Sequence, residues 1–305
     1  MRILAQEKDE TTLVPETLND LWSIYTQAKG KIFWQKTLRT SVICKGGEIQ
    51  KGKKKPVYLG ILAQKASFEG NKIRITGLIT EGEERNKHHS IYIELEKKAK
   101  IIGELEGLPK SAKREILVCV CDKSKTLIAL LKGGRFYEIE EILSKRREEE
   151  YFKEVSTNLK RKSPNYLLIA GPDKIRDKIR QRIELPGKVF SDSVSSGGKS
   201  GLEEIAKRSI VREILEKQRE DEEKKAVEEM LSEVRKNPQK TMYGLDANNQ
   251  PERAKELIVL SEFAPKYEAA LKSAQAAGCR IRIVDSSKDY ARELKKFEIV
   301  GVGRW

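Results

Sequence analysis

Residues 116–121 read ILVCVC, an uninterrupted apolar run with the length of one buried β-strand. A second strand-like run follows at 126–131, and the pair Gly133-Gly134 leads into a third run at 135–142. Glycine pairs between two such runs are typical of tight turns. This stretch therefore predicts a sheet that is built outward from one buried strand.

Helical patterns follow that sheet. Charged helical stretches at 144–162 and 173–183 enclose another apolar run at 166–170. A longer helical pattern begins at Gly201 and continues to residue 234, and its almost wholly charged middle is typical of a solvated helix that connects domains. Strands followed by helices indicate an α/β unit. We predict a central α/β domain at 115–236.

The segment that precedes it, 1–114, is rich in short strand-like runs. One helical stretch lies early, at 17–29, and the run SIYIEL at 90–95 alternates cleanly between apolar and polar residues. The strand-like runs occupy 38–44, 56–66, 72–79 and 90–95. Short strands at this spacing predict a small barrel or sandwich.

The last segment, 237–305, alternates strands and helices over short connections. Strand-like runs occupy 257–260, 280–284 and 297–302, and helical runs occupy 265–277 and 289–296. This pattern predicts a compact α/β domain. Together the three segments predict an α+β multidomain protein.

The charge balance favours a polyanionic partner. The chain of 305 residues has 61 Lys and Arg against 47 Asp and Glu, a formal net charge of +14. Each cation near a phosphate releases a condensed counterion, so a surplus of this size favours nucleic acid. Ion-pair networks on a thermophile surface would explain the 35% of charged residues, but they would not explain the surplus.

Membrane insertion and export are not indicated. No apolar run reaches the length of a spanning helix, and the charged residues 7–10 stand where a signal peptide needs an apolar core. Two of the four cysteines, Cys119 and Cys121, lie in the buried strand and lack the C-x-x-C spacing of a zinc site. We expect a cytoplasmic protein without a metal site or a disulfide.

A basic segment is the strongest candidate site. Residues 45–55 read KGGEIQKGKKK and lie between two strand-like runs, so we expect a flexible cationic loop. Point charges on such a loop suit RNA phosphates, although a solvated hairpin tip remains the alternative. The predicted RNA-binding residues are Lys45, Lys51, Lys53, Lys54 and Lys55.

Two other motifs do not indicate a phosphate-binding loop or a metal site. The sequence GGKS at 197–200 resembles the end of a phosphate-binding loop, but Ser193 stands where that loop needs its first glycine. We therefore expect a glycine turn before a helix. The two histidines, His88 and His89, are neighbours in a strand and point to opposite faces, so they cannot share one metal. We predict no catalytic residue.

Several segments, in order, resemble the Pelota family of archaeal and eukaryotic ribosome-rescue factors, which are related to class-1 release factors. The similar segments are 12–16, 20–25, 89–91, 194–204, 242–245 and 281–304. The resemblance implies an Sm-like β-barrel first domain and a central domain related to the middle domain of release factors. It also implies a C-terminal domain like the ribosomal proteins that bind kink-turn RNA.

The resemblance implies a function and partners as well. Such factors enter the empty A site of stalled ribosomes and promote subunit dissociation in no-go and non-stop mRNA surveillance. Their partners are an elongation factor 1α-type GTPase and an ABC-class recycling ATPase. We expect a monomer that needs no cofactor and does not hydrolyse peptidyl-tRNA, because Gly-Gly-Gln occurs nowhere in the chain.

Two departures from the family stand out. Many relatives end the central strand in Pro-Gly-Phe, a turn that contacts the GTPase, whereas this chain has Gly171-Pro172-Asp173-Lys174. The resemblance thus assigns only Pro172 to the GTPase contact. The stretch after Tyr243 also looks short.

The alternative function is a divalent-metal-dependent endoribonuclease that cleaves mRNA on stalled ribosomes. Such a site needs converging carboxylates. Glu16 and Asp20 share one helix face, but an acidic pair at a helix start more often compensates the helix dipole at the surface.

Overall fold

The computed structural model describes the chain except residues 46–47, 83–84, 109–113, 146, 245–248 and 305, and for residues 39–45 and 48–54 it describes the backbone only. The described residues form two compact units, Met1–Ser111 with Glu222–Trp305, and Ala112–Asp221. Each predicted segment contributes one sheet. The three-domain boundaries themselves stay a prediction, since the first and third segments share a unit.

The N-terminal sheet has seven strands in the order β1-β2-β7-β3-β4-β5-β6. Their bounds are β1 Arg2–Glu7, β2 Glu10–Val14, β3 Ile32–Lys45, β4 Glu48–Glu69, β5 Lys72–Glu81, β6 His88–Glu94 and β7 Ala99–Ile102. Alternate residues of β5 and β6 are buried, which confirms the alternation seen in the sequence. The strands β1, β2 and β7 were not among the predicted strand-like runs.

Helix α1, Leu18–Thr26, covers this core and begins with a capping box. The Thr17 hydroxyl accepts from the Asp20 amide at 3.1 Å, and the Asp20 carboxylate accepts from the Thr17 amide at 3.0 Å. These two bonds satisfy amides that a helix start leaves without partners. The opposite, apolar side of the helix buries Leu21 and Ile24.

The same helix contacts the C-terminal part of its unit. The Asn19 side chain donates to the Ile281 carbonyl at 2.6 Å and accepts from the Ile283 amide at 2.9 Å, so one amide group pairs with an edge strand. The Tyr25 hydroxyl donates to Glu268 at 2.9 Å. These contacts explain why residues far apart in the chain belong to one unit.

The central sheet has five strands in the order β10-β9-β8-β11-β12. The strands are β8 Glu115–Cys121, β9 Lys125–Lys132, β10 Arg135–Leu143, β11 Tyr166–Gly171 and β12 Lys188–Ser193. The helices are α2 Glu148–Lys162, α3 Asp173–Gln181, α4 Gly198–Lys207 and α5 Ile210–Lys236. The predicted sequence of strands and helices is confirmed, and β12 is the strand that was missed.

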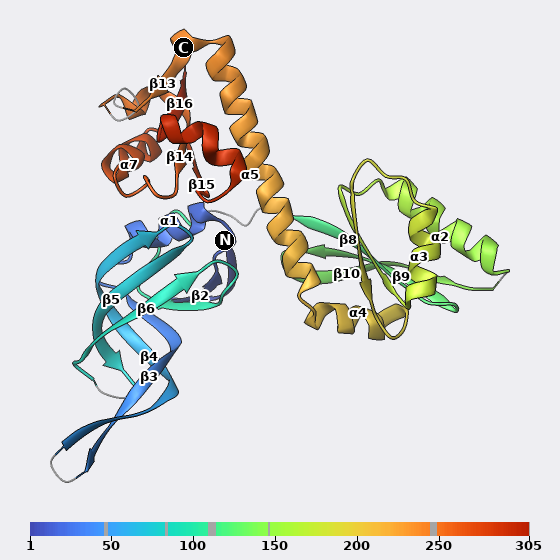
Figure 1. Ribbon diagram of the computed structural model, residues 1–305, viewed down its shortest axis with the longest axis horizontal. Coiled ribbons are helices and arrows are strands. Elements are labelled where there is room, and N and C mark those ends of the chain that lie inside the picture. Colours follow the sequence, from blue (N-terminus) through green and yellow to red (C-terminus); the bar gives the residue numbers. More distant parts are fainter. Residues whose placement is uncertain (46–47, 83–84, 109–113, 146, 245–248, 305) are drawn as a thin grey trace. The chain divides into compact units, whose positions relative to one another are not determined.

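The run ILVCVC explains how this sheet is covered on both faces. Leu117, Cys119 and Cys121 pack with α2 and α3 on one side, and the alternate residues of β8 pack with α4 and the start of α5 on the other (Figure 1). Both sets are almost fully buried. A strand buried on both faces must be apolar throughout, which is why it dominates the sequence pattern.

The predicted long helix is in fact two helices. Helix α4 ends at Lys207, Arg208 is extended with ψ 158°, and α5 begins at Ile210. The boundary between the two compact units then falls inside α5, between Asp221 and Glu222. This is the charged middle of the pattern, and the apolar residues before it and after it pack into different cores.

The C-terminal sheet has four strands in the order β13-β16-β14-β15. They are β13 Thr241–Tyr243, β14 Ala254–Leu260, β15 Arg280–Val284 and β16 Ile299–Gly303, with α7 at Glu268–Ala276. Residues 289–296 form a 3-10 helix, η3, where a helix was predicted, and short 3-10 turns lie at Pro238–Lys240 and Pro251–Arg253. The short stretch after Tyr243 includes residues outside the described ones.

The α+β multidomain class is confirmed by these mixed layers. In the part of the chain that the structure describes, no helix combines the length and the apolar character needed to cross a membrane.

Candidate nucleic-acid interface

The basic segment is a paired ribbon and not the loop that was predicted. Strand β3 continues to Lys45 and β4 begins at Glu48, and these two residues lie opposite each other. Cys44 pairs with Ile49 in the same register. The prediction was wrong because β-branched residues on both sides favour strand, and a ribbon without a core tolerates lysine on either face.

The ribbon has no third strand beside it. Strand β7 pairs with β3 only over Ile32–Trp34, and β5 pairs with β4 only over Gly60–Glu69. Beyond these stretches the described residues of β3 and β4 pair with each other alone, and Figure 1 shows their ends reaching past the other strands. Among the described residues, no other strand therefore pairs with either backbone edge of the ribbon.

The five predicted lysines all belong to this ribbon. Lys45 ends β3, and the other four lie in the first part of β4. Lys55 is exposed, whereas the side chains of Lys45, Lys51, Lys53 and Lys54 lie outside what the structure describes. The structure brings the five residues together along the chain, and their contact with RNA stays a prediction.

An aromatic pair at the root of the ribbon was not predicted from the sequence. The rings of Trp34 on β3 and Tyr58 on β4 lie 5.1 Å apart between centroids, with 31° between their planes. Lys100 on β7 places its Nζ 5.9 Å from the centroid of the Trp34 ring. Only the register of three strands brings these residues together, so no local motif could have revealed them.

The sequence GGKS lies at the start of α4, as expected, but the helix start is already occupied. The Asp122 carboxylate accepts from the Gly197 amide at 2.8 Å and also from the amides of Ser124 and Lys125. Burial acts to raise the pKa of Asp122, but these hydrogen bonds outweigh it and lower the pKa. A carboxylate held at this helix start leaves no place there for a phosphate.

Lys199, which a phosphate-binding loop would use, points to protein instead. Its ammonium pairs with Glu138 at 3.1 Å. The motif is therefore a structural turn.

Glu204 gives a pH-dependent test of the same turn. Its carboxylate accepts from the Ser195 amide at 3.0 Å and from the Ser195 hydroxyl at 2.8 Å, and it pairs with Arg208. These bonds, in that order, lower the pKa of Glu204 from its ordinary 4.5 to about 2. Because the folded pKa is depressed, the stabilisation is present above the unfolded value and is lost as pH falls towards 2.

We expect the carboxyl resonance of Glu204 to titrate near pH 2 in an NMR series. The stability difference between the native chain and Glu204→Gln should shrink as the pH is lowered from 4.5. A midpoint for Glu204 near its ordinary value would contradict the hydrogen bonds from Ser195.

Pro172, the residue assigned to the GTPase contact, lies between β11 and α3. It precedes the first residue of α3 with φ −56°, and it is half-buried. The next two residues, Asp173 and Lys174, are exposed, and Asp173 pairs with Arg176 at 3.0 Å. Pro172 is thus at an accessible corner of the central unit.

The acidic pair proposed for a nuclease has structural partners. Asp20 is buried, accepts from the amides of Glu16 and Thr17, and lies 2.7 Å from the Met1 amine. Glu16 lies 3.8 Å from Arg2. The expectation of a surface pair was wrong for Asp20, because the capping box turns it inward. Among the described residues, no group of three or more His, Cys, Asp or Glu side chains could hold a metal ion.

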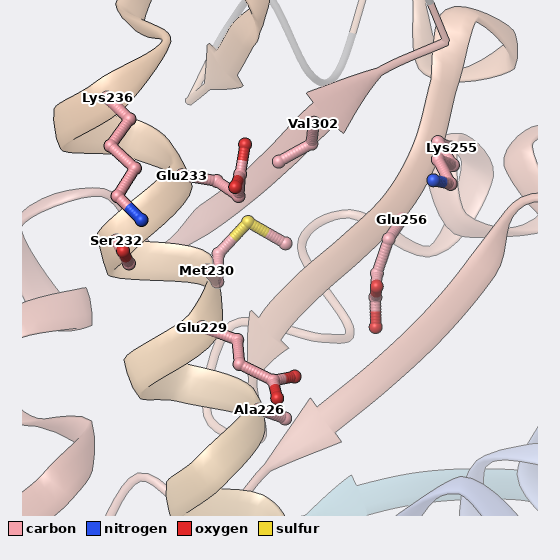
Figure 2. Close-up of a pocket in the computed structure, with 9 residues that line it drawn as sticks. All are labelled: Ala226, Glu229, Met230, Ser232, Glu233, Lys236, Lys255, Glu256 and Val302. Atoms are coloured by element: carbon pink, nitrogen blue, oxygen red, sulfur yellow. The ribbon is translucent and has the colours of Figure 1, made fainter.

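A cavity of about 530 Å³ lies between α5 and the C-terminal sheet (Figure 2). Met230 from α5 and Val302 from β16 give it an apolar floor, and Glu233 and Lys236 stand at its rim. Glu256 on the far side is held by Arg282 at 2.6 Å. The cavity combines charges of both signs without a His or Cys among its lining residues, so we assign it no reaction.

Comparison with known proteins shows what the chain is similar to. Residues 1–107 match the family model of the Pelota N-terminal domain. The pelota homologue of Methanocaldococcus jannaschii is 29% identical over 97% of this chain and 96% of its own length. The homologue of Archaeoglobus fulgidus is 27% identical, with 95% and 93% covered.

Solved structures agree on the fold. The crystal structure of Archaeoglobus fulgidus Pelota matches over 100% of this chain and 99% of its own, with a TM-score of 0.75 and 24% identity. A model of ribosome-bound archaeal Pelota and ABCE1 matches over the same shares with a TM-score of 0.53 and 24% identity. The fold is that of an α+β multidomain protein. The chain thus carries a Pelota N-terminal domain and is similar over nearly its whole length to archaeal pelota homologues, which confirms the resemblance seen in its sequence.

Proposed function

We propose that this protein is a ribosome-rescue factor that recognises stalled ribosomes with an empty A site and promotes their dissociation. The similarity to archaeal pelota homologues over nearly the whole chain supports this function. The observation that carries it is the two-stranded basic ribbon, which extends past its sheet and can enter a narrow channel lined with RNA phosphates. A factor of this kind acts in the cytoplasm.

The proposed test is co-sedimentation with ribosomes. Ribosomes whose mRNA is truncated at the P site should retain the protein, and ribosomes whose mRNA fills the downstream channel should retain less. Because the sequence of the basic segment offers no side chain suited to reading base edges besides Gln50, retention should not depend on the codon. Equal retention on both kinds of ribosome would contradict the function.

The partners follow from the family. We propose an elongation factor 1α-type GTPase for delivery and an ABC-class ATPase for subunit splitting, with this protein acting as a monomer. A related archaeal Pelota is described together with the ribosome and ABCE1.

The GTPase contact predicts a defined mutational effect. Pro172→Ala should weaken binding to GTP-bound elongation factor 1α by roughly fivefold or more, the effect of truncating one well-packed interface residue. Pro164→Ala is the matched control, since Pro164 is also half-buried and precedes the same strand at its other end. Binding constants from titration calorimetry check both variants. An unchanged constant for Pro172→Ala would remove this residue from the contact.

We propose that the protein acts without catalysing a reaction and needs no cofactor. The structural partners of Asp20 and Glu16 support this reading, since a nuclease would need such carboxylates free to hold a metal. Cleavage of labelled RNA by the pure protein, abolished by EDTA, would establish the endoribonuclease instead.

We also expect that the protein does not release the peptide from peptidyl-tRNA. With peptidyl-tRNA in the P site and no added hydrolase, release should stay at the rate of ribosomes alone, because the chain lacks Gly-Gly-Gln. A class-1 release factor serves as the positive control. Release clearly above that background would contradict the expectation.

A further inference from the structure

The two faces of strands β3, β4 and β7 differ sharply in chemistry. Phe33, Leu59 and Ile101 are fully buried and belong to the core of the N-terminal sheet. Successive residues of a strand point to opposite faces, so Trp34, Tyr58 and Lys100 lie on the other face. This outer face carries large aromatic side chains where a solvated sheet normally carries polar ones.

The aromatic pair is held in place by the sheet itself. Trp34 lies directly opposite Gly60, and a Cβ on Gly60 would come within 2.9 Å of the Trp34 ring. The missing side chain thus gives the indole room to lie on the strand. Its buried Nε1 has no hydrogen-bond partner among the described atoms, so packing on Gly60 and Tyr58 sets the ring orientation.

The pair also leaves one ring accessible. Tyr58 is 52% exposed, and neither Tyr58 nor Trp34 belongs to a hydrophobic cluster of the described residues. Exposed aromatic area costs free energy in water, which makes it a candidate for a ligand that offers another flat surface.

The charges around the pair favour an anion. Lys36 lies directly opposite Tyr58, is exposed, and has no ion-pair partner among the described residues. Lys100 lies near the Trp34 ring and pairs with Glu10 at 2.7 Å. The other acidic residue beside Gly60 is Glu81, whose carboxylate is taken by Arg85 at 3.2 Å. Glu10 and Glu81 thus each have a cationic partner, and Lys36 is available to an anionic ligand.

We propose that Trp34 and Tyr58 form a stacking platform for an unpaired base of single-stranded RNA, with Lys36 on the adjoining phosphate. Base–aromatic stacking beside cations that track the backbone is the general solution for binding single strands. The platform lies at the root of the basic ribbon, where the exposed Leu38 and Pro56 lead to Lys55. The ribbon therefore holds phosphates, and its root holds a base.

A protein partner is the competing occupant of an exposed aromatic patch. The exposed Lys36 favours RNA, as does the position of the platform beside a segment with five further lysines in its sequence, because cations near phosphates release counterions. The inference deepens the proposed function by naming an RNA contact, and it rests on that function only for its place on the ribosome. Stacking itself is measurable on the free protein.

The test compares two fluorescent probes of equal length, single-stranded oligoadenylate and an abasic oligomer with the same phosphates. Fluorescence anisotropy at one fixed salt concentration gives both affinities for the full chain. The native protein should bind oligoadenylate more tightly by roughly 5- to 100-fold, the value of one stacked base. Tyr58→Leu should abolish that preference, and Tyr58→Phe should keep it.

The chain supplies a matched control. Tyr92 on β6 is 36% exposed and has the Lys72 ammonium 4.5 Å from its ring centroid, but it stands apart from the Trp34–Tyr58 pair. Tyr92→Leu should leave the preference unchanged. Oligoadenylate should also quench the fluorescence of Trp34, and this component should vanish in Trp34→Phe.

Three results would overturn the platform. Equal affinity of the native protein for both probes would mean a purely electrostatic surface. An unchanged preference in Tyr58→Leu would place any stacking elsewhere. Lost capture of the GTPase by Tyr58→Leu, with RNA binding intact, would assign the patch to a protein. If only the co-sedimentation with ribosomes failed, the oligonucleotide result would still support the stacking platform. The platform and the proposed function can therefore be refuted separately.

Discussion

Replacement of the five ribbon lysines by serine should flatten the salt dependence of ribosome binding. The replaced residues are Lys45, Lys51, Lys53, Lys54 and Lys55. Each lost phosphate contact reduces the slope of log affinity against log salt by roughly 0.7, and five contacts by roughly 3.5, taking the single-strand figure as a guide. At low salt this change in slope corresponds to a loss of several orders of magnitude in affinity for the ribosome. Co-sedimentation with truncated-mRNA ribosomes over a salt series measures the slope.

Melting curves should change little, since this part of β3 and β4 pairs with no third strand among the described residues, and substitutions away from a core stay within about 0.5 kcal/mol each. The control removes five other lysines of the N-terminal segment, so that both variants lose equal charge. The control residues are Lys8, Lys29, Lys65, Lys97 and Lys98, which are all exposed. If both variants showed the same slope, net charge alone would account for binding and the ribbon would have no special role.

Gly77→Ala should strongly destabilise the N-terminal sheet. A Cβ at residue 77 would lie 1.8 Å from the Leu62 carbonyl oxygen and 3.0 Å from the Gln64 amide nitrogen. Both are backbone atoms beside the β-bulge between Ala63 and Lys65, so they cannot rotate away. Overpacking costs typically 1–3 kcal/mol, and we expect about 3 kcal/mol or more at this site.

Gly70→Ala is the matched comparison in the turn between the same two strands. Its φ of +65° disfavours alanine, but no atom lies within 4 Å of the added Cβ. We expect a cost of about 1 kcal/mol, the ordinary penalty of the left-handed region. Urea unfolding followed by circular dichroism measures both variants. Equal midpoints would mean that β4 and β5 separate easily at the bulge.

Strands were predicted best from the sequence where burial imposes a simple pattern of apolar residues. The alternating run at 90–95 became part of β6, and the apolar run at 116–121 became β8. Strand β12 was missed because it ends one edge of the central sheet, where Ser191 and Asp192 are only half-buried and no strong pattern is required. A strand at the edge of the sheet therefore lacks the apolar run by which a central strand is predicted.

The candidate site was predicted in part for a similar reason. Charge composition located the five lysines, because a cationic surplus is visible without any structure. It could not show that the segment is strand, since glycine and lysine are poor strand formers and only cross-strand pairing overrides them. Trp34 and Tyr58 are far apart in the sequence, and only the pairing of Lys36 with Tyr58 brings them together.

The isolated pairing of the ribbon also determines how its reach can evolve. A two-stranded ribbon that touches no third strand can gain or lose one opposed pair of residues per step without disturbing the core. A single inserted residue would turn every later side chain to the other face. The bulge between Thr40 and Val42 already absorbs one such odd residue. The length of the ribbon can therefore change with little effect on the stability of the fold. Selection can then match this length to the depth of the channel that we propose it enters.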